Sequence, residues 1–252
     1  MPAVEAAPAR FAPGIGRTID FGDVHVWAVE EGGDDQTQLL AVLDADERAR
    51  AARFRFERHR REFVAAHWLL RRALSYYDGR PPAAWRFASE PGGRPVIAGD
   101  SHGRGPLRFS LSHAGGGALV AVTHELAVGV DLEGQASLAR INEIAPRILN
   151  ASECIAWQHD LDRPRAARFA LTRWTLKEAY AKARGLGLKL DFTSVGFAET
   201  GGFWALAAAP ADDLHRTDWR FFTFAPWRDS CAALAVLPRG GDVDWRLIKI
   251  TL

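Results

Sequence analysis

The sequence predicts an α+β fold built from two similar halves. Each half contains one long stretch with the spacing of a helix and a small set of short strand candidates, most of them close enough to form hairpins. We place the boundary after residue 133, which gives subdomains 1–133 and 134–252. No internal repeat accompanies this order, so the predicted structural duplication rests on the order of the elements alone.

The first half begins with a strand predicted over Val24–Val29. A helix is predicted from Asp44 to Tyr77, because large apolar residues recur there every seven or four positions between charged ones. Gly79–Pro82 ends this helix, and turn residues follow at Pro91–Pro95. Three short strands are predicted after them: Leu107–Leu111, Ala118–Thr123 and Ala127–Leu132.

The second half begins with a helical region over Ile141–Trp157, interrupted near Pro146 because proline removes a helix hydrogen bond. Asn150 and Glu153 have the spacing of a capping box. A second long helix is predicted from Ala166 to Arg184, with glycines directly after it. Four more strands are predicted: Phe192–Ala198, Phe203–Ala208, Trp219–Phe224 and Cys231–Leu237.

Composition limits the classes of function. The chain has 252 residues, and its formal charge of +1 gives no bulk field that would recruit nucleic acid or a membrane surface. Two cysteines are too few for a disulfide framework or a four-thiolate zinc site. Neither a signal peptide nor a span of membrane length is evident, so we expect a cytoplasmic protein. Of the 32 basic residues only four are lysine, and three of those lie between Lys177 and Lys189.

Asp131 and Glu133 stand two apart near the end of a predicted strand, so their side chains project to the same face. Carboxylates this close repel each other unless a cation or a proton lies between them, and oxygen ligands of this kind suit Mg²⁺. The alternative is a pair of solvent-facing residues at a strand end.

Glu178 and Lys182 are four apart on the second long helix and share a face with Trp174. An ordinary surface ion pair would have the same spacing. The rarity of lysine in this chain favours a specific role, because a compact ammonium differs from a guanidinium at a phosphate.

Two further features suggest anion binding. Ser112 and His113 follow a strand and precede three glycines, where hydroxyl, imidazole and backbone N–H groups can meet a phosphate, although a plain hairpin loop has the same pattern. The arginine-rich run from Arg48 to Arg72 fits a solvated helix face, a nucleic-acid patch or a cradle for a small polyanion. Together with the carboxylates, these features predict Mg²⁺-assisted chemistry on a pyrophosphate.

The sequence resembles the Sfp type of 4′-phosphopantetheinyl transferases. Two signatures carry the resemblance: Gly129–Glu133, with the sequence GVDLE, and Trp174–Lys182, with the sequence WTLKEAYAK. Gly93–Ile97 and Phe109–His113 support it in the same order. The resemblance is clear over roughly Gly92 to Phe197.

The resemblance implies a monomer of two α+β halves that binds coenzyme A between them. Such an enzyme moves the phosphopantetheine arm to a serine of an apo acyl or peptidyl carrier protein and releases 3′,5′-ADP. It further implies a role for each matching residue: Asp131, Glu133 and Glu178 as Mg²⁺ ligands; Glu178, Lys182 and His113 in catalysis; and Ser112, His113, Gly93, Arg94, Lys177, Lys182, Arg55 and Arg61 as contacts to coenzyme A. Glu62 departs from the family pattern, because a basic residue is common there.

Two rival functions stay open. One is a Mg²⁺-dependent nuclease, although such an enzyme usually has its second acid and lysine two apart on a strand. The other is a binding module for coenzyme A or a carrier protein that has lost its metal. Chain length and the resemblance favour a transferase of polyketide or nonribosomal peptide synthesis, without identifying its carrier.

Overall fold

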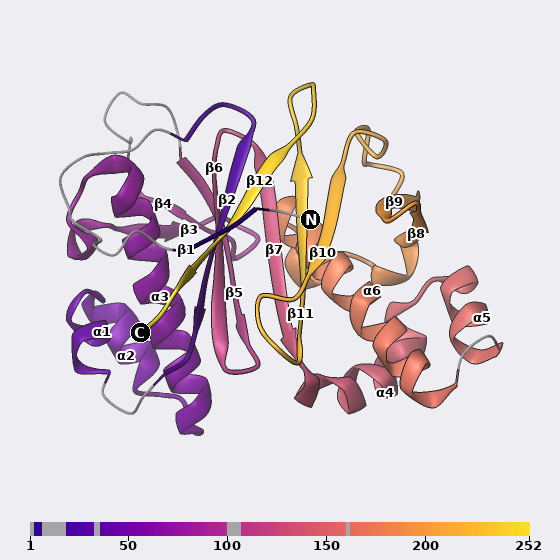
Figure 1. Cartoon of the computed structure of the whole chain (residues 1–252), viewed down its shortest axis with the longest axis horizontal. Helices are drawn as coiled ribbons and strands as arrows, with labels where there is room; N and C mark the ends of the chain where they lie inside the picture. The colour runs from indigo at the N-terminus through magenta and orange to yellow at the C-terminus, as the bar shows by residue number, and fades with distance from the viewer. Residues whose placement is uncertain (1–2, 7–18, 33–35, 100–106, 160–161) are drawn as a thin grey trace.

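The computed structural model describes residues 3–6, 19–32, 36–99, 107–159 and 162–252, and within them two five-stranded sheets form the centre of the molecule (Figure 1). The first sheet has, in spatial order, β1 (Ala3–Ala6), β12 (Asp244–Ile250), β2 (Asp23–Glu30), β6 (Gly117–His124) and β5 (Leu107–Ala114). The second has β7 (Ala127–Gly134), β11 (Ser230–Leu237), β10 (Arg220–Phe224), β9 (Phe203–Ala208) and β8 (Gly196–Thr200).

The two sheets pack against each other, and helices cover their outer faces. Along β2, Val24 and Val26 face the second sheet, whereas Trp27 and Val29 face the long helix α3 (Glu57–Asp78). This alternation follows from the two-residue period of a strand. Because both faces are covered, the central strands are almost continuously apolar.

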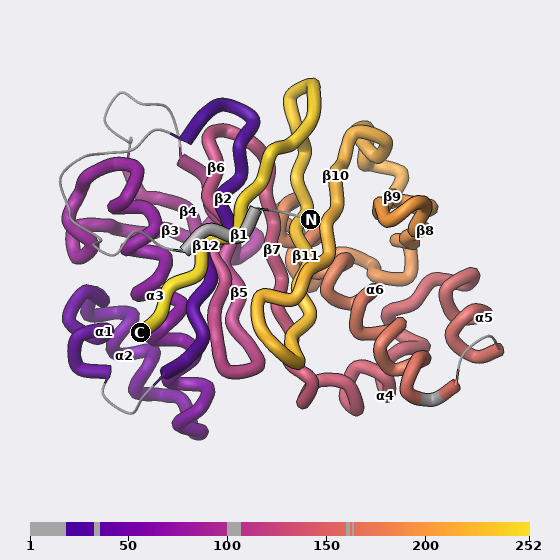
Figure 2. The backbone as a smooth tube through the Cα atoms, viewed as in Figure 1, coloured from indigo at the N-terminus to yellow at the C-terminus, as the bar shows by residue number. Residues whose placement is uncertain are grey.

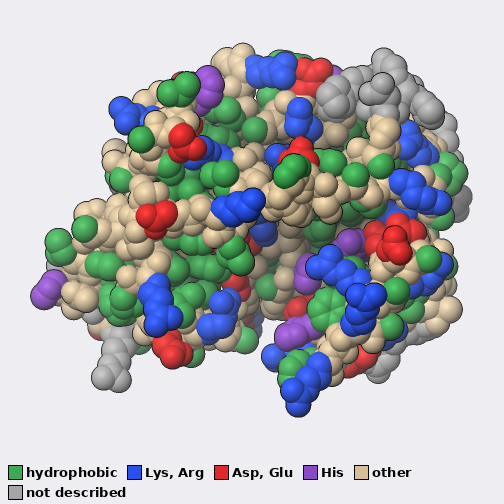
Figure 3. Space-filling model, turned by 180° about the vertical axis from the view of Figure 1, so that it is seen from behind, with side chains coloured by type: hydrophobic (Ala, Val, Ile, Leu, Met, Phe, Trp, Pro, Cys, Tyr) green, Lys and Arg blue, Asp and Glu red, His purple; other side chains and the backbone are tan. Residues whose placement is uncertain are grey.

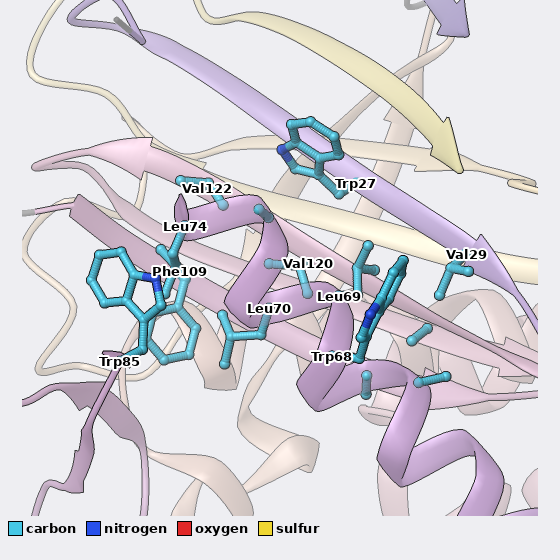
Figure 4. Close-up of a cluster of buried hydrophobic side chains, with 14 of the residues drawn as sticks. Trp27, Val29, Trp68, Leu69, Leu70, Leu74, Trp85, Phe109, Val120 and Val122 are labelled. Atoms are coloured by element: carbon cyan, nitrogen blue, oxygen red, sulfur yellow. The ribbon is translucent and has the colours of Figure 1, made fainter. Parts of the chain in front are cut away.

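The helix α3 covers the first sheet, and its buried residues form one cluster with Trp27, Trp85 and Phe109 (Figure 4). The helix α6 (Arg163–Ala183) covers the second sheet, where Leu176 and Tyr180 pack against β10 and β11. Each half therefore joins one long helix to one sheet, which confirms the predicted α+β fold of two halves. The shorter elements are α1 (Thr37–Ala41), α2 (Ala45–Ala51), η1 (Pro82–Ala84), β3 (Phe87–Ser89), β4 (Pro95–Ile97), η2 (Gln135–Ser137), α4 (Leu138–Ile148), α5 (Ala151–His159), η3 (Gly187–Lys189) and η4 (Phe192–Ser194).

Four sequence predictions need correction. The interruption expected near Pro146 falls at Leu149–Asn150 instead, because Pro146 lies inside α4 and α5 begins at Ala151. The helix expected from Asp44 to Tyr77 is two helices, because the chain turns before Phe56, whose extended backbone begins α3. The strand expected over Phe192–Ala198 begins only at Gly196, and the short helix η4 precedes it. The prediction missed β12, which ends the chain.

The C-terminal strand returns to the first half of the molecule (Figure 2). There β12 lies between β1 and β2 and is parallel to both. Conversely, β7 lies almost entirely before residue 134 in the sequence but belongs to the second sheet. The division into subdomains at residue 133 therefore stays a proposal. In the structure, β12 from the second part of the sequence joins the first sheet, and β7 from the first part joins the second sheet. Within the described residues, no helix is long and apolar enough to cross a membrane.

Candidate active site

The edge strands β5 and β7 of the two sheets lie side by side, and four of the predicted site residues meet there: Ser112, Asp131, Glu178 and Lys182. Helix α6 packs closely on β7 because Gly129 has no side chain: a Cβ there would come within 1.9 Å of the carbonyl oxygen of Ala179. This close approach brings the helix residues Glu178 and Lys182 to the strand residue Asp131. The close packing of α6 on β7 therefore explains why the GVDLE signature begins with glycine.

Asp131 and Lys182 form an ion pair at the centre of the site. Lys182 Nζ donates to Asp131 Oδ1 at 2.7 Å, to Ser112 Oγ at 2.9 Å and to the carbonyl of Val130 at 3.1 Å. Asp131 is buried, whereas the Lys182 side chain is 27% exposed. The other carboxylate oxygen of Asp131, Oδ2, is buried and has no hydrogen-bond partner in the described part of the chain.

Glu178 lies half-buried beside this pair. Burial raises its pKa to about 7, and the negative charges of Asp131 and Glu133 act in the same direction, while Lys182 opposes them. A carboxyl group with this pKa exchanges a proton readily near neutral pH, which is what a general base or acid requires.

Glu133 is the most strongly hydrogen-bonded of the three carboxylates. Its Oε1 accepts from the indole N–H of Trp174 at 2.8 Å and from Arg140 at 3.2 Å, and its Oε2 accepts from the hydroxyl of Ser137. Three protein donors therefore hold Glu133 in place on the second half of the molecule.

A cleft of about 890 Å³ opens next to Glu133 between the two halves, and we call it the interlobe cleft. Figure 3 shows the hollow from behind, with histidine and arginine or lysine side chains gathered on the side of the first half. Its polar and charged lining residues are Glu31, Arg58, His59, Glu62, His113, Glu133, Gln135, Ser137, Arg140, Arg228 and Asp229.

His113 lines the interlobe cleft as a neutral imidazole. Burial lowers its pKa to about 4, and the positive charges of His67, Lys182 and Arg50 add to the effect. Its Nδ1 is buried without a hydrogen-bond partner among the described residues. At neutral pH this ring can exchange hydrogen bonds with a ligand but carries no charge.

Gly93 and Arg94 lie at a second, smaller cavity of about 220 Å³, which Lys182 also lines. Burial lowers the pKa of Arg94, whose guanidinium donates to the carbonyl of Ala183 at 3.5 Å, just beyond Lys182 on α6. The structure thus brings Gly93 and Arg94 to a cavity that Lys182 shares.

Lys177 was predicted as a contact to coenzyme A, and the structure places its ammonium inside the protein. The side chain is fully buried and its ammonium donates to Glu153 Oε2 at 2.6 Å and to the carbonyls of Ile148 and Phe192 at 2.6 and 3.0 Å. Lys182 also has three protein acceptors, but its side chain is 27% exposed, whereas Lys177 is fully buried and a ligand cannot reach its ammonium.

Three other predicted contacts differ from expectation. Ser112 is 7% exposed and its hydroxyl is taken up by protein groups, so it does not offer itself to a phosphate. Arg55 is exposed, lies over the ring of Phe56 and is not among the described residues that line the interlobe cleft. Arg61 pairs at 2.5 Å with Glu31, which lines the cleft.

Glu62, which departs from the family pattern, has a structural role. Its carboxylate accepts from the backbone N–H of Gly116 at 3.0 Å and so ties helix α3 to the turn between β5 and β6. At the same turn a Cβ on Gly115 would come within 2.7 Å of Gly134, so the two halves touch there.

The carboxylate oxygens of Asp131, Glu133 and Glu178 are suitable ligands for a divalent cation. Asp131 keeps a buried carboxylate oxygen without a donor, and Glu178 is close enough to Asp131 and Glu133 for their charges to raise its pKa. Mg²⁺ commonly takes one or two carboxylates and completes its shell with water and phosphate. Within the described ranges, however, no three acidic, histidine or cysteine side chains are already arranged as a metal-binding group.

Sequence reasoning missed Arg58, His59 and Arg140 as lining residues of the cleft. Arg58 and His59 stand inside the arginine-rich run, where nothing distinguished them from their neighbours. Trp174 had a signal, since it shares a helical stripe with Glu178, and it proves to be the donor that holds Glu133.

The joint between the two α+β halves thus gathers carboxylates, a lysine and a histidine, an arrangement suited to acid–base chemistry on a charged substrate. Residues 30–125 match the family model described as 4′-phosphopantetheinyl transferase, N-terminal, and residues 127–235 match that of the 4′-phosphopantetheinyl transferase superfamily. The chain belongs to this superfamily, and it is an enzyme of the transferase class that the sequence predicted.

Its relatives agree with this assignment. The 4′-phosphopantetheinyl transferase HetI of Nostoc sp. is 34% identical over 222 residues, which cover 87% of this chain and 90% of that protein. The human L-aminoadipate-semialdehyde dehydrogenase-phosphopantetheinyl transferase is 28% identical over 63% of this chain and 54% of its own length. Among solved structures, a holo-[acyl-carrier-protein] synthase from Neisseria meningitidis is 21% identical with a TM-score of 0.38, and covers 44% of this chain and 97% of that one.

Proposed function

We propose that this enzyme transfers the 4′-phosphopantetheine arm of coenzyme A to a serine of an apo acyl or peptidyl carrier protein, with Mg²⁺, and releases 3′,5′-ADP. The observation that carries the proposal is Glu178, a half-buried carboxyl with a pKa of about 7 beside the Asp131–Lys182 ion pair. The family of the chain and the cleft between its halves support it.

In the proposed reaction, the carrier serine oxygen forms a bond to the β-phosphorus of coenzyme A. The bond from that phosphorus to the bridging oxygen breaks, and the electron pair leaves with 3′,5′-ADP. Glu178 accepts the serine proton, which its pKa near 7 permits at neutral pH. Lys182 lies within reach of Asp131 and supplies a fixed positive charge for the departing phosphate.

We propose that Asp131, Glu133 and Glu178 would hold the Mg²⁺, and that it would neutralise charge on the pyrophosphate when bound. Coenzyme A would extend from the small cavity lined by Gly93, Arg94 and Lys182 to the interlobe cleft. There we propose Arg58 and His59, in place of Arg55 and Arg61, as the polar contacts from the first half. The monomeric state, the cytoplasmic location and a carrier from polyketide or nonribosomal peptide synthesis stay predictions.

The test is to incubate the protein with Mg²⁺, coenzyme A and an apo carrier protein and to weigh the carrier by intact mass spectrometry. A gain of one phosphopantetheine arm supports the proposal, and omission of Mg²⁺ should prevent it. Binding of coenzyme A without transfer would indicate the binding module instead. Cleavage of DNA without transfer would indicate the nuclease.

A further inference from the structure

The hydroxyl groups of Ser110 and Ser112 join the edges of the two sheets. The two residues are two apart on β5, so both point to the same face, toward β7. Ser110 Oγ accepts from the backbone N–H of Val130 at 3.0 Å, and Ser112 Oγ accepts from that of Leu132 at 3.2 Å. These bonds satisfy buried backbone donors of β7 on the side that faces β5.

Ser112 differs from Ser110 because its hydroxyl also contacts the charged pair. It donates its one proton to Asp131 Oδ1 at 2.9 Å and accepts from Lys182 Nζ at 2.9 Å. A hydroxyl has one donor and two acceptor positions, so with Leu132 the capacity of Ser112 is complete. A phosphate could bind this hydroxyl only by displacing one of these partners.

The contacts of Ser112 also determine how Asp131 is presented. Both Ser112 and Lys182 donate to the same oxygen, Oδ1, and this fixes the carboxylate through one of its two oxygens. The other oxygen, Oδ2, is left buried and without a hydrogen-bond partner in the described residues. Oδ2 is therefore the oxygen that a cation can bind. If the carboxylate were free to rotate, Oδ2 would turn toward a hydrogen-bond donor instead.

We propose that Ser112 is a positioning residue: its hydroxyl fixes Asp131 and Lys182 relative to each other and does not contact coenzyme A. This inference rests on the proposed function, since it deepens the role of the same site. It reassigns a residue that the sequence motif presents as a ligand contact.

The chain offers a matched control in Ser110→Ala. Ser110→Ala and Ser112→Ala each remove one hydroxyl between β5 and β7, and only Ser112→Ala removes the contact to Lys182 and Asp131. We expect both variants to lose a similar amount of thermal stability. Ser112→Thr, which keeps a hydroxyl, should restore the properties that Ser112→Ala loses.

In the transfer assay we expect Ser112→Ala to lower kcat about 10- to 100-fold and to raise the Mg²⁺ concentration for half-maximal rate about tenfold, with the KM for coenzyme A changed less than about threefold. Ser110→Ala should stay within about twofold of the parent in kcat and in the Mg²⁺ concentration for half-maximal rate. Its KM for coenzyme A does not serve as a control, because Ser110 lines the small cavity beside Gly93 and Arg94. A tenfold rise in the KM for coenzyme A with unchanged kcat would overturn the proposal, because it would indicate a direct ligand contact.

A second measurement uses the protein alone and does not depend on activity. Because the chain has four lysines, the ammonium groups can be resolved by ¹H–¹⁵N NMR, with the buried Lys177 as an internal reference. We expect slow proton exchange at Lys182 in the parent and in Ser110→Ala, and exchange at least tenfold faster in Ser112→Ala. Unchanged exchange in Ser112→Ala would contradict the proposal, whereas a parent protein without transferase activity would contradict only the proposed function. If Ser112→Ala does not fold, Ser112→Cys, with its weaker thiol donor, takes its place in both measurements.

Discussion

Helix α6 carries two lysine–carboxylate pairs whose surroundings differ. In the Lys177–Glu153 pair both side chains are buried, and every carboxylate oxygen has a donor: Oε1 accepts from the backbone of Phe197, and Oε2 from Asn150 and Lys177. In the Lys182–Asp131 pair the lysine is partly exposed and one carboxylate oxygen has no partner in the described residues.

The difference separates a structural pair from a functional one. A buried ion pair whose hydrogen bonds are complete holds α5, α6 and β8 together and has nothing left to offer a ligand. A pair that leaves a buried oxygen without a partner carries an energetic cost, and such costs are characteristic of functional sites. Variants of the two pairs should therefore affect different properties.

The largest effect on activity is expected from Glu178→Gln, beside the Lys182–Asp131 pair. Loss of the base and of one charge at the metal position should lower kcat/KM about a thousandfold, or about 4 kcal/mol of transition-state stabilisation. The melting temperature should not fall, because the change removes a carboxyl whose pKa is raised by burial and by its neighbours. The exposed Glu143→Gln serves as the control. Parent-like turnover in Glu178→Gln would disprove its role.

The largest effect on stability is expected from Lys177→Met in the structural pair. Leaving Glu153 buried without its partner should cost about 3–5 kcal/mol in the free energy of unfolding, measured by urea denaturation. The double variant Lys177→Met/Glu153→Gln should recover part of this loss, because glutamine leaves no unpaired charge and its amide oxygen still accepts from one of the two backbone N–H groups that Glu153 binds. A stable Lys177→Met with an increased KM for coenzyme A would instead restore Lys177 as a ligand contact.

His113 should make the folded protein sensitive to acid. In the unfolded chain its pKa is 6.5, and in the folded protein it is about 4, so the unfolded state binds more protons between these values. The contribution to stability is therefore full above pH 6.5, falls as the pH falls toward 4, and amounts to at most about 3 kcal/mol. His113→Gln should flatten the unfolding free energy over this range. An unchanged pH profile would contradict the lowered pKa.

The smallest effects are expected among the arginines of the first half. Arg58 lines the interlobe cleft, and Arg58→Ala should raise the KM for coenzyme A about 5- to 10-fold, as expected for one partly exposed charged contact. Arg55→Ala should change it less than about twofold, because Arg55 lies over Phe56. Equal effects of both variants would mean that only the general positive charge of this run matters.

Much of the fold could be predicted from local patterns. The strands β5, β6, β7, β9 and β11 and the helix α6 agree with the predicted ranges to within a few residues, and the capping box of Asn150 and Glu153 is present. The break before α3 was not predicted because apolar spacing continues across it. There the buried Arg71 binds Asp44 and Glu47, a tie between α2 and α3 that residue spacing does not reveal.

The sequence by itself determined which residue types share a face. Spacing put Asp131 with Glu133 and Glu178 with Lys182, because the periods of strand and helix are fixed by backbone geometry. Only the tertiary structure decided what each face meets. Lys177 and Lys182 belong to one helical motif, yet the packing of α6 on β7 at Gly129 turns Lys182 toward Asp131 and Lys177 toward Glu153. That choice depends on contacts between residues far apart in the chain, and local spacing does not contain it.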